Sequence, residues 1–255
     1  MRPVVIRLVA LLVLPLGAFA ALACSGSAPQ LSHVFAAPPW QGAESYNYNL
    51  LDQGNNLTGT CVLKTVPEQP TAGRTQLEYP CGNGAGDTDN RVVVVDSQTL
   101  APISSTRTTF DKKKNSTTTV TSDYADGKVQ LKFNDNGTVH SVSRGLPGPT
   151  KESPDPGYYD DAALFWVVRG IPLQKGYQGA YTDVNASASG GQVFTAKVDV
   201  EATGSLTVPA GTFQAFRIRL DTDSITQYFW VNAAAPHQVI RAQIESTIFE
   251  LSGPK

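Results

Sequence analysis

The chain has 255 residues, with 20 Lys and Arg against 22 Asp and Glu, and charged residues make up only 16% of it. Without a basic excess, the composition excludes proteins that bind nucleic acid through a cationic surface. The length allows one large β domain or two small ones. Abundant Ser, Thr, Gly and Asn are typical of an extracytoplasmic β protein rather than of a cytosolic enzyme.

The first 23 residues predict an export signal. Arg2 and Arg7 precede an almost unbroken apolar run over residues 8–20, and Ala21-Leu22-Ala23-Cys24 ends it with small residues before a thiol. This pattern predicts a lipoprotein signal peptide over residues 1–23 and lipidation of Cys24. An ordinary secretion signal and a retained membrane anchor are the alternatives, although Pro15 and Gly17 interrupt the apolar run. Removing the leader takes away two arginines and no acid, which leaves 18 basic against 22 acidic residues, a formal charge of −4.

Residues 24–43 contain Pro29, Pro38 and Pro39 and show no periodicity, so we expect a flexible tether there. Residues 44–255 are expected to form a single β domain.

The two remaining cysteines predict a disulfide within a hairpin. Residues 57–66 and 74–81 read as strands on either side of a turn, and centring the turn on Thr71 places Cys61 opposite Cys81. The same register pairs Thr65 with Leu77. A disulfide persists only in an oxidising compartment. Two free buried thiols are the alternative.

Further strands are expected from alternating apolar and polar residues. Asp126-Gly127 and Asn136-Gly137 are tight-turn signals, and local turns between short strands predict an antiparallel meander. One segment differs, because Tyr158–Arg169 has apolar residues at helical spacing. The expected strands cover residues 44–50, 91–96, 103–110, 116–124, 129–133, 194–202, 205–208, 213–221, 225–231 and 237–251.

These elements predict a mainly β fold: a strongly curved antiparallel sheet or open β-barrel of about ten to twelve strands with one helix. The helix would cover one opening or face of this sheet.

Two segments resemble a known family. They are Leu206-Thr207-Val208-Pro209-Ala210-Gly211-Thr212-Phe213 with its continuation to Ile218, and Phe229-Trp230-Val231 followed by Ala235-Pro236-His237-Gln238-Val239-Ile240-Arg241. Together with the helical segment they are similar to the bacterial envelope family called domain of unknown function 3108, over roughly residues 44–249. The resemblance implies an exported β protein without an assigned activity, and a fold similar to LolA/LolB-like lipoprotein carriers.

The sequence offers no catalytic or metal-binding constellation. His33, His140 and His237 are far apart, and neither an HExxH nor a GxSxG motif is present. We therefore expect no enzyme activity, no cofactor and no metal.

A ligand site is expected instead beside the helix, with Phe165, Trp166 and Trp230 as apolar members. Arg169, Arg217, Arg219 and Arg241 would meet an anionic headgroup if they converge at the mouth of the sheet. An outward face bearing solvated arginines is the alternative.

The sequence thus favours a lipid-anchored protein of the cell envelope with a binding or carrier-like domain for an apolar or lipid-like ligand. The alternative is a structural or adaptor envelope protein whose sheet is filled by its own side chains. A cavity of several hundred Å3 would distinguish the two, because ligand sites are of that size. No nucleic-acid partner is expected, and the membrane is contacted through the N-terminal lipid.

The role of Cys24 can be tested with a Cys24→Ser variant expressed from the full chain. Without the thiol no lipid can be attached, so the variant should move from the membrane pellet to the soluble fraction. Immunoblotting of the two fractions is the measurement. Retention of the variant in the pellet would contradict lipidation.

Overall fold

The computed structural model describes residues 30–186, 190–222 and 225–253. The expected signal peptide and Cys24 lie outside the described residues. Within them the protein is mainly β: fifteen strands form one sheet, accompanied by one 3-10 turn and one short α-helix. The sheet is not closed, because β8 and β9 are its two edges.

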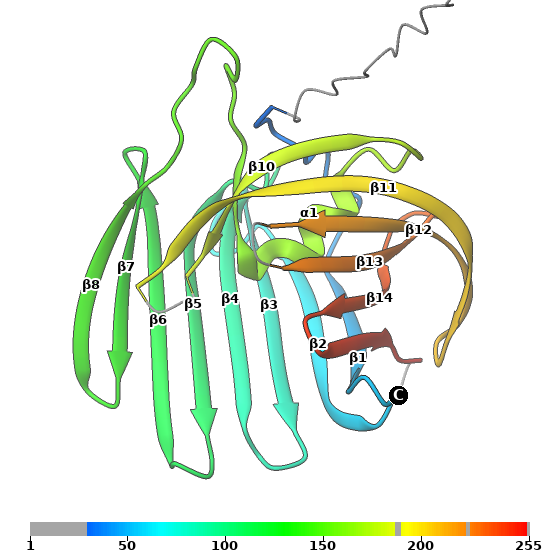
Figure 1. Ribbon diagram of the computed structural model, residues 1–255. Coiled ribbons are helices and arrows are strands. Elements are labelled where there is room, and N and C mark those ends of the chain that lie inside the picture. Colours follow the sequence, from blue (N-terminus) through cyan, green and yellow to red (C-terminus); the bar gives the residue numbers. More distant parts are fainter. Residues whose placement is uncertain (1–29, 187–189, 223–224, 254–255) are drawn as a thin grey trace, which may run out of the picture.

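The first eight strands form an up-and-down meander (Figure 1). Its tight turns have the expected chemistry, since Asp126-Gly127 and Asn136-Gly137 all adopt positive φ, as two-residue hairpin turns require. The strands are β1 (Glu44–Leu51), β2 (Leu57–Pro67), β3 (Arg74–Asn83), β4 (Thr88–Asp96), β5 (Pro102–Asp111), β6 (Ser116–Ala125), β7 (Lys128–Asp135) and β8 (Thr138–Gly145).

The β2–β3 hairpin has the register expected from the sequence. Cys61 pairs with Cys81 and Thr65 with Leu77, and the two cysteines form a disulfide. This confirms the predicted bond. The bond lies on the inner face of the sheet, where Cys61 is buried.

The second half of the chain completes the sheet. It contains β9 (Tyr158–Asp160), the 3-10 turn η1 (Asp161–Ala163), α1 (Leu164–Gly170), β10 (Gln178–Asn185), β11 (Gln192–Val208), β12 (Gly211–Asp221), β13 (Thr226–Asn232), β14 (Val239–Ile244) and β15 (Thr247–Leu251). β15 pairs with β1, so the last strand of the chain joins the first in the middle of the sheet.

The strand count of ten to twelve was too low, and two boundaries were wrong. The single strand expected at 237–251 is β14 and β15, because Glu245 adopts positive φ in a tight turn without Gly, Asn or Pro to mark it. Conversely, the two strands expected at 194–202 and 205–208 are the single strand β11. A register shift between Val200 and Ala202 bends that strand instead of ending it.

The helix is shorter than the predicted Tyr158–Arg169. Tyr158, Tyr159 and Asp160 pair with β10 as a strand, and Asp160 accepts a hydrogen bond from the Ala162 amide to start the 3-10 turn. β9 and β10 are parallel, which makes the sheet mixed rather than purely antiparallel. Parallel neighbours need a crossover connection, and η1 and α1 supply it.

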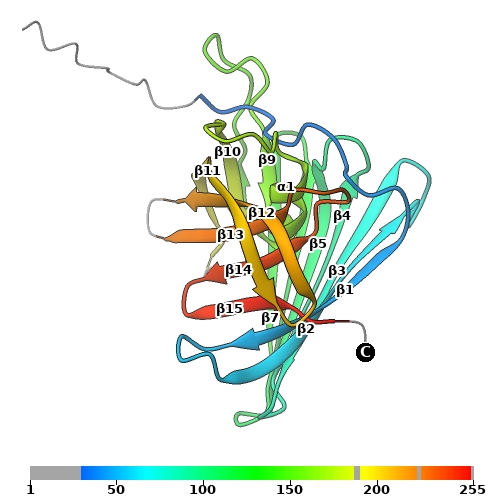
Figure 2. The same cartoon turned by 90° about the vertical axis from the view of Figure 1, so that its right-hand side faces the viewer.

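All seven residues of α1 are buried, because the helix lies within the concave side of the sheet (Figures 1 and 2). The Phe165 ring packs against the rings of Tyr48, Tyr79, Phe229 and Phe249, with centroids 5.2–5.9 Å away. These partners come from both halves of the sheet. The core therefore forms around one side chain of the helix. No helix within the described residues is long and apolar enough to cross a membrane.

A second, smaller apolar cluster closes the seam between the meander and β10–β11. Leu131 on β7 and Val184 on β10 are fully buried members of it. Beside them Arg144 of β8 donates hydrogen bonds to the carbonyls of Gly190 and Gly191. A side chain at Gly191 would collide with Leu131, so this close approach requires glycine. Side-chain packing thus holds the seam, where β8 and β11 form no ladder.

Residues 31–40 do not form the flexible tether expected over residues 24–43, because they are bound to the domain. The Ser32 amide donates to the Ala180 carbonyl and the Ala36 amide to the Gly170 carbonyl, both at 2.8 Å. Phe35 and Trp40 are buried against the domain, and a side chain at Gly170 would collide with the Phe35 ring. The proline-rich composition gave no sign that Val34, Phe35 and Trp40 are buried against the domain. We call residues 31–40 the strap.

We expect Phe35→Ala to lower the free energy of unfolding by about 3 kcal/mol, because it leaves a cavity where the strap meets α1. For a domain of this size the melting temperature should fall by roughly 6–12 °C, as measured by circular dichroism. Val139→Ala is the control, since Val139 is 51% exposed on an edge strand. Equal melting temperatures for the two variants would show that the strap does not stabilise the domain.

Candidate functional site

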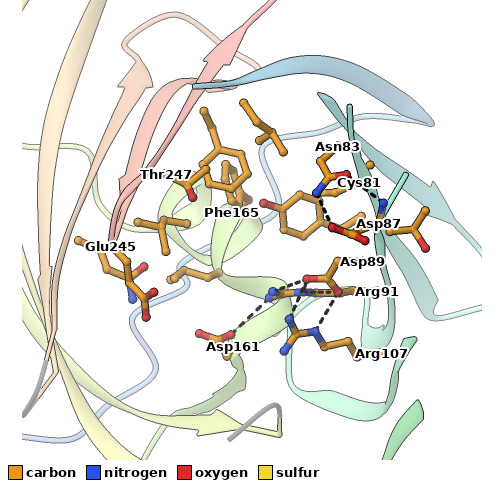
Figure 3. Close-up of a pocket in the computed structure, with 18 of the residues that line it drawn as sticks. Cys81, Asn83, Asp87, Asp89, Arg91, Arg107, Asp161, Phe165, Glu245 and Thr247 are labelled. Carbon is orange, nitrogen blue, oxygen red and sulfur yellow. Dashed lines mark hydrogen bonds and ion pairs between the residues drawn. The ribbon is translucent and has the colours of Figure 1, made fainter. Parts of the chain in front are cut away.

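A cleft of about 550 Å3 opens on the concave side of the sheet (Figure 3). Strands β3–β5 form one wall, β13–β15 form the other, and η1 and the first turn of α1 lie between them. Its lining is half apolar and half polar. The lining residues that the argument uses are Leu50, Tyr79, Asp87, Asp89, Arg91, Arg107, Asp161, Leu164, Phe165, Gln227, Ile244, Glu245, Thr247 and Phe249.

The apolar part of the cleft follows from strand alternation. Phe249 pairs with Ala242 on one side and Leu50 on the other, so all three point to the concave face. Leu164 and Phe165 reach the same space from α1. A ligand can therefore contact the exposed side of the aromatic core.

The charged part lies on β4 and β5, where Arg91 and Arg107 are register partners on the inner face. Both guanidinium groups bind the Asp89 carboxylate: Arg107 through Nε and Nη2 at 2.8 and 2.9 Å, and Arg91 through Nη2 at 3.0 Å. Arg91 Nη1 also lies 3.5 Å from Asp161 Oδ2. Figure 3 shows the four side chains as one network at one end of the cleft.

Burial and charge have opposite effects on the acids of this network. Burial alone would raise the pKa of Asp89, but the hydrogen bonds and charges of Arg107 and Arg91 hold it below its ordinary value. At Asp161 burial prevails: it raises the pKa despite the Arg91 charge, and the Asp160 carboxylate adds to the rise. Behind them, burial raises the pKa of Asp183 well above its ordinary value, and the charges of Asp161 and Asp160 add to it.

Two acidic side chains flank the opening of the cleft. Asp87 is held in the β3–β4 turn by hydrogen bonds from Asn83 Nδ2 and from the Lys112 amide. Glu245 is exposed on the opposite side, in the β14–β15 turn next to Thr247. Figure 3 shows the two groups on opposite sides of the space.

The structure places the predicted apolar site residues at three different positions. Phe165 lines the cleft. Trp166 is buried behind it, where its indole Nε1 donates to Thr65 Oγ1 at 2.8 Å. Trp230 lies on the outer face of the sheet, because its neighbour Phe229 points inward.

The four arginines predicted to meet a headgroup do not converge. Arg217 and Arg241 are the register partners of Trp230 and share its outer face, where they pair with Glu201 and Glu250. Arg219 is two residues along the same face and binds Asp221. This is the outward arrangement named above as the alternative.

Arg169 lies on the helix side of the sheet, apart from the other three arginines. It donates to Glu44 Oε2 and to the carbonyls of Pro236 and His237. Its guanidinium also lies over the rings of Trp40 and Tyr46, at 5.4 and 5.5 Å. These contacts tie the end of α1 to β1 and to the turn before β14, so Arg169 has a structural role.

Sequence reasoning missed the charged residues of the cleft. A signal for them existed, because centring the turn after β4 on Thr99 places Arg91 opposite Arg107, as observed. No local pattern pointed to Asp161 or Gln227, since these reach the cleft only through the crossover and the second half of the sheet.

The three histidines lie outside the cleft lining, and each has its own contact elsewhere. His237 Nδ1 lies 2.9 Å from the Asn232 carbonyl, and the His140 ring stacks on Phe133. In the strap, His33 Nε2 lies 3.1 Å from Asp155 Oδ1. The described residues contain no group of three or more His, Cys, Asp or Glu that could hold a metal ion.

Fold and cleft define a class: a β domain with an open, strongly curved sheet around a buried helix, stabilised by a disulfide. The disulfide indicates an extracytoplasmic location, because such bonds persist in oxidising compartments. Within this class, the chain belongs to the family described as Protein of unknown function (DUF3108), which matches residues 81–248. This confirms the resemblance seen in the sequence.

Among solved structures, the chain is similar to the beta-barrel-like protein of domain of unknown function DUF1849 from Brucella abortus. The two share 13% identity and a TM-score of 0.50, over 83% of this chain and 95% of the other. At this identity the similarity concerns the fold. A candidate lipoprotein from Parabacteroides distasonis and a candidate exported protein with a YmcC-like fold from Bacteroides fragilis each match at 10% identity and a TM-score of 0.33, over 87% of this chain and 99% of theirs. No curated protein matches the chain.

The raised pKa of Asp183 predicts a pH-dependent stability. The folded state holds the Asp183 proton more tightly than the unfolded state, so this group lowers stability as the pH rises through its folded pKa. Asp183→Asn removes the titration and should raise the melting temperature by a few degrees at pH 8 and by less at pH 5. The same change at exposed Asp123 is the control. An equal or larger gain at pH 5 would contradict the assignment.

Proposed function

We propose that the protein is a cell-envelope lipoprotein, anchored through Cys24, whose domain binds an apolar or lipid-like ligand without chemical conversion. The cleft of about 550 Å3 is the observation that carries the proposal. Its volume lies within the range of small-molecule sites, about 300–1,000 Å3. A sheet filled by its own side chains, as the structural or adaptor alternative requires, would leave no such space.

The apolar lining supports an acyl or similar chain as the buried part of the ligand. Leu50, Leu164, Phe165 and Phe249 line one continuous side of the cleft. Each methylene group removed from water by such a surface contributes about 0.8 kcal/mol to binding. A chain of several methylene groups therefore gains enough free energy to offset the cost of ordering it.

The proposal of a non-catalytic domain is supported by the side chains themselves. In the described part of the chain, neither His140 nor His237 has a Ser or Asp side chain as a hydrogen-bond partner. In the cleft, Asp89 binds Arg91 and Arg107, and Asp161 lies 3.5 Å from Arg91. This arrangement holds charges in place and activates no nucleophile.

The position of the strap limits how far the domain would lie from the membrane and which end would face it. Only seven residue steps separate Cys24 from Leu31, which pairs with β10, and they span at most about 25 Å. Figure 1 shows the β3–β4 hairpin, which carries Asp87, at the opposite end of the domain from the strap. A lipid on Cys24 would therefore hold the strap end close to the membrane and the opening of the cleft away from it.

The proposal is tested on the mature chain carrying Cys24→Ser. Mass spectrometry of organic extracts from the purified protein should detect a lipid-like compound. Thr247→Trp, which places an indole in the cleft, should weaken binding of a fluorescent apolar probe at least tenfold. Thr138→Trp is the control, since Thr138 is exposed on edge strand β8. Extracts without such a compound, together with equal probe binding by both variants, would favour the structural or adaptor alternative.

A further inference from the structure

We propose that the ligand of this cleft is an amphiphile whose head carries a hydroxyl or amide hydrogen-bond donor and no negative charge, rather than a fatty acid or another anion. The inference rests on the proposed function and specifies its ligand class. Two independent observations support it: the charge balance around the cleft and the amide of Gln227.

The charge balance leaves no cation available for an acidic head. Among the described residues that line the cleft, the cations are Arg91 and Arg107, and both bind Asp89. Arg91 also faces Asp161 at 3.5 Å. A ligand carboxylate or phosphate that bound these guanidinium groups would compete with Asp89, which both arginines already bind in a largely buried position.

The wider surroundings are acidic rather than basic. Asp160 and Asp183 are buried directly behind Asp161, and the described lining of the cleft holds no cation besides Arg91 and Arg107. At the opening, the acids Asp87 and Glu245 flank the path into the cleft. An anion would therefore find no further cation along the described lining of the cleft.

Gln227 provides the second observation. It points to the same concave face as Phe229, two residues along β13, and lines the cleft with only 7% of its surface exposed. Among the described residues nothing donates a hydrogen bond to its Oε1, although the atom is buried. A buried carbonyl oxygen without a donor is unfavourable. This oxygen has almost no exposed surface, so an O–H or N–H group brought by a ligand would satisfy it once the Gln227 side chain turns the oxygen toward the cleft. A carboxylate, a phosphate dianion or a quaternary ammonium has no such hydrogen to offer.

The two observations lead to one chemistry. Leu50, Leu164, Phe165 and Phe249 offer a surface for the chain, while Gln227 offers an acceptor for the head. A monoacylglycerol, a fatty alcohol or a fatty amide meets both requirements.

Three probes with the same twelve-carbon chain test the head: 1-monolauroylglycerol, laurate and dodecyltrimethylammonium. Each is titrated below its micellar concentration against the mature Cys24→Ser chain loaded with a fluorescent apolar probe, at pH 7.5. The monoglyceride should displace the probe at a concentration at least tenfold lower than either charged compound. Displacement by laurate or by the ammonium compound at an equal or lower concentration would overturn the inference.

A variant tests the Gln227 contact itself. Gln227→Leu keeps nearly the same volume and removes the acceptor, so it should weaken binding of the monoglyceride about 3- to 10-fold, the equivalent of one hydrogen bond. Binding of laurate should stay unchanged, and the melting temperature should not fall. Gln214→Leu, at an exposed glutamine on β12, is the matched control. Unchanged binding of the monoglyceride, or an equal loss for all three probes, would overturn the role of Gln227.

The outcomes separate this inference from the function on which it rests. If all three compounds displace the probe equally and Thr247→Trp blocks them, the cleft binds chains and only the choice of head is wrong. If none displaces the probe and Thr247→Trp has no effect, both proposals fail.

Discussion

The constraint on which the rest of the structure depends is the complete burial of α1. A seven-residue helix that is apolar nearly all round must be enclosed, and here the sheet encloses it by curving. Phe165 packs against aromatic rings from β1, β3, β13 and β15, so both halves of the sheet need the helix to complete one core. The polar ends of the buried side chains are satisfied at fixed points, Trp166 on Thr65 and Arg169 on Glu44, and these bonds set how the helix is oriented within the curve.

The cleft follows from the shortness of that helix. Seven residues span only about 10 Å, and the helix cannot extend toward its N-terminus because Asp160 belongs to β9 and caps the turn that follows. The concave side of the sheet therefore continues beyond the end of α1 with no helix to fill it. Arg91 and Arg107 are exposed to this space because strand alternation places them on the row that also carries the buried Tyr79. Asp161 meets them there as the first residue of η1, which explains why a charged network lies beside an aromatic core.

Much of the fold could be predicted from the sequence, and the failures have physical reasons. The register of Cys61 with Cys81 depends only on a local turn and on alternation, and both are visible in the sequence. The turn at Glu245 was hidden because no Gly, Asn or Pro marks it. In addition, Ile248 continues the even-numbered apolar pattern, although the turn moves the face of Ala242 and Ile244 to Thr247 and Phe249. Arg217, Arg219 and Arg241 share a face as alternation requires, but which face points outward depends on the curvature of the whole sheet. The strap was misread because composition reports flexibility, whereas burial of Phe35 depends on a groove formed by Gly170, far away in the sequence.

The strap and the cleft are connected through α1. Phe35 packs on Gly170 at the C-terminal end of the helix, while Leu164 and Phe165 at its N-terminal end line the cleft. A rigid helix of seven residues thus separates the segment closest to Cys24 from the ligand space. Because the strap is hydrogen-bonded to Ala180 and Gly170, the domain cannot turn freely about that segment. With an anchor at Cys24, the opening of the cleft would face away from the anchoring membrane. An amphiphile would then enter from the aqueous side of the envelope rather than directly from that membrane. A neutral head suits that route, because Arg91 and Arg107 inside the cleft are already bound by Asp89.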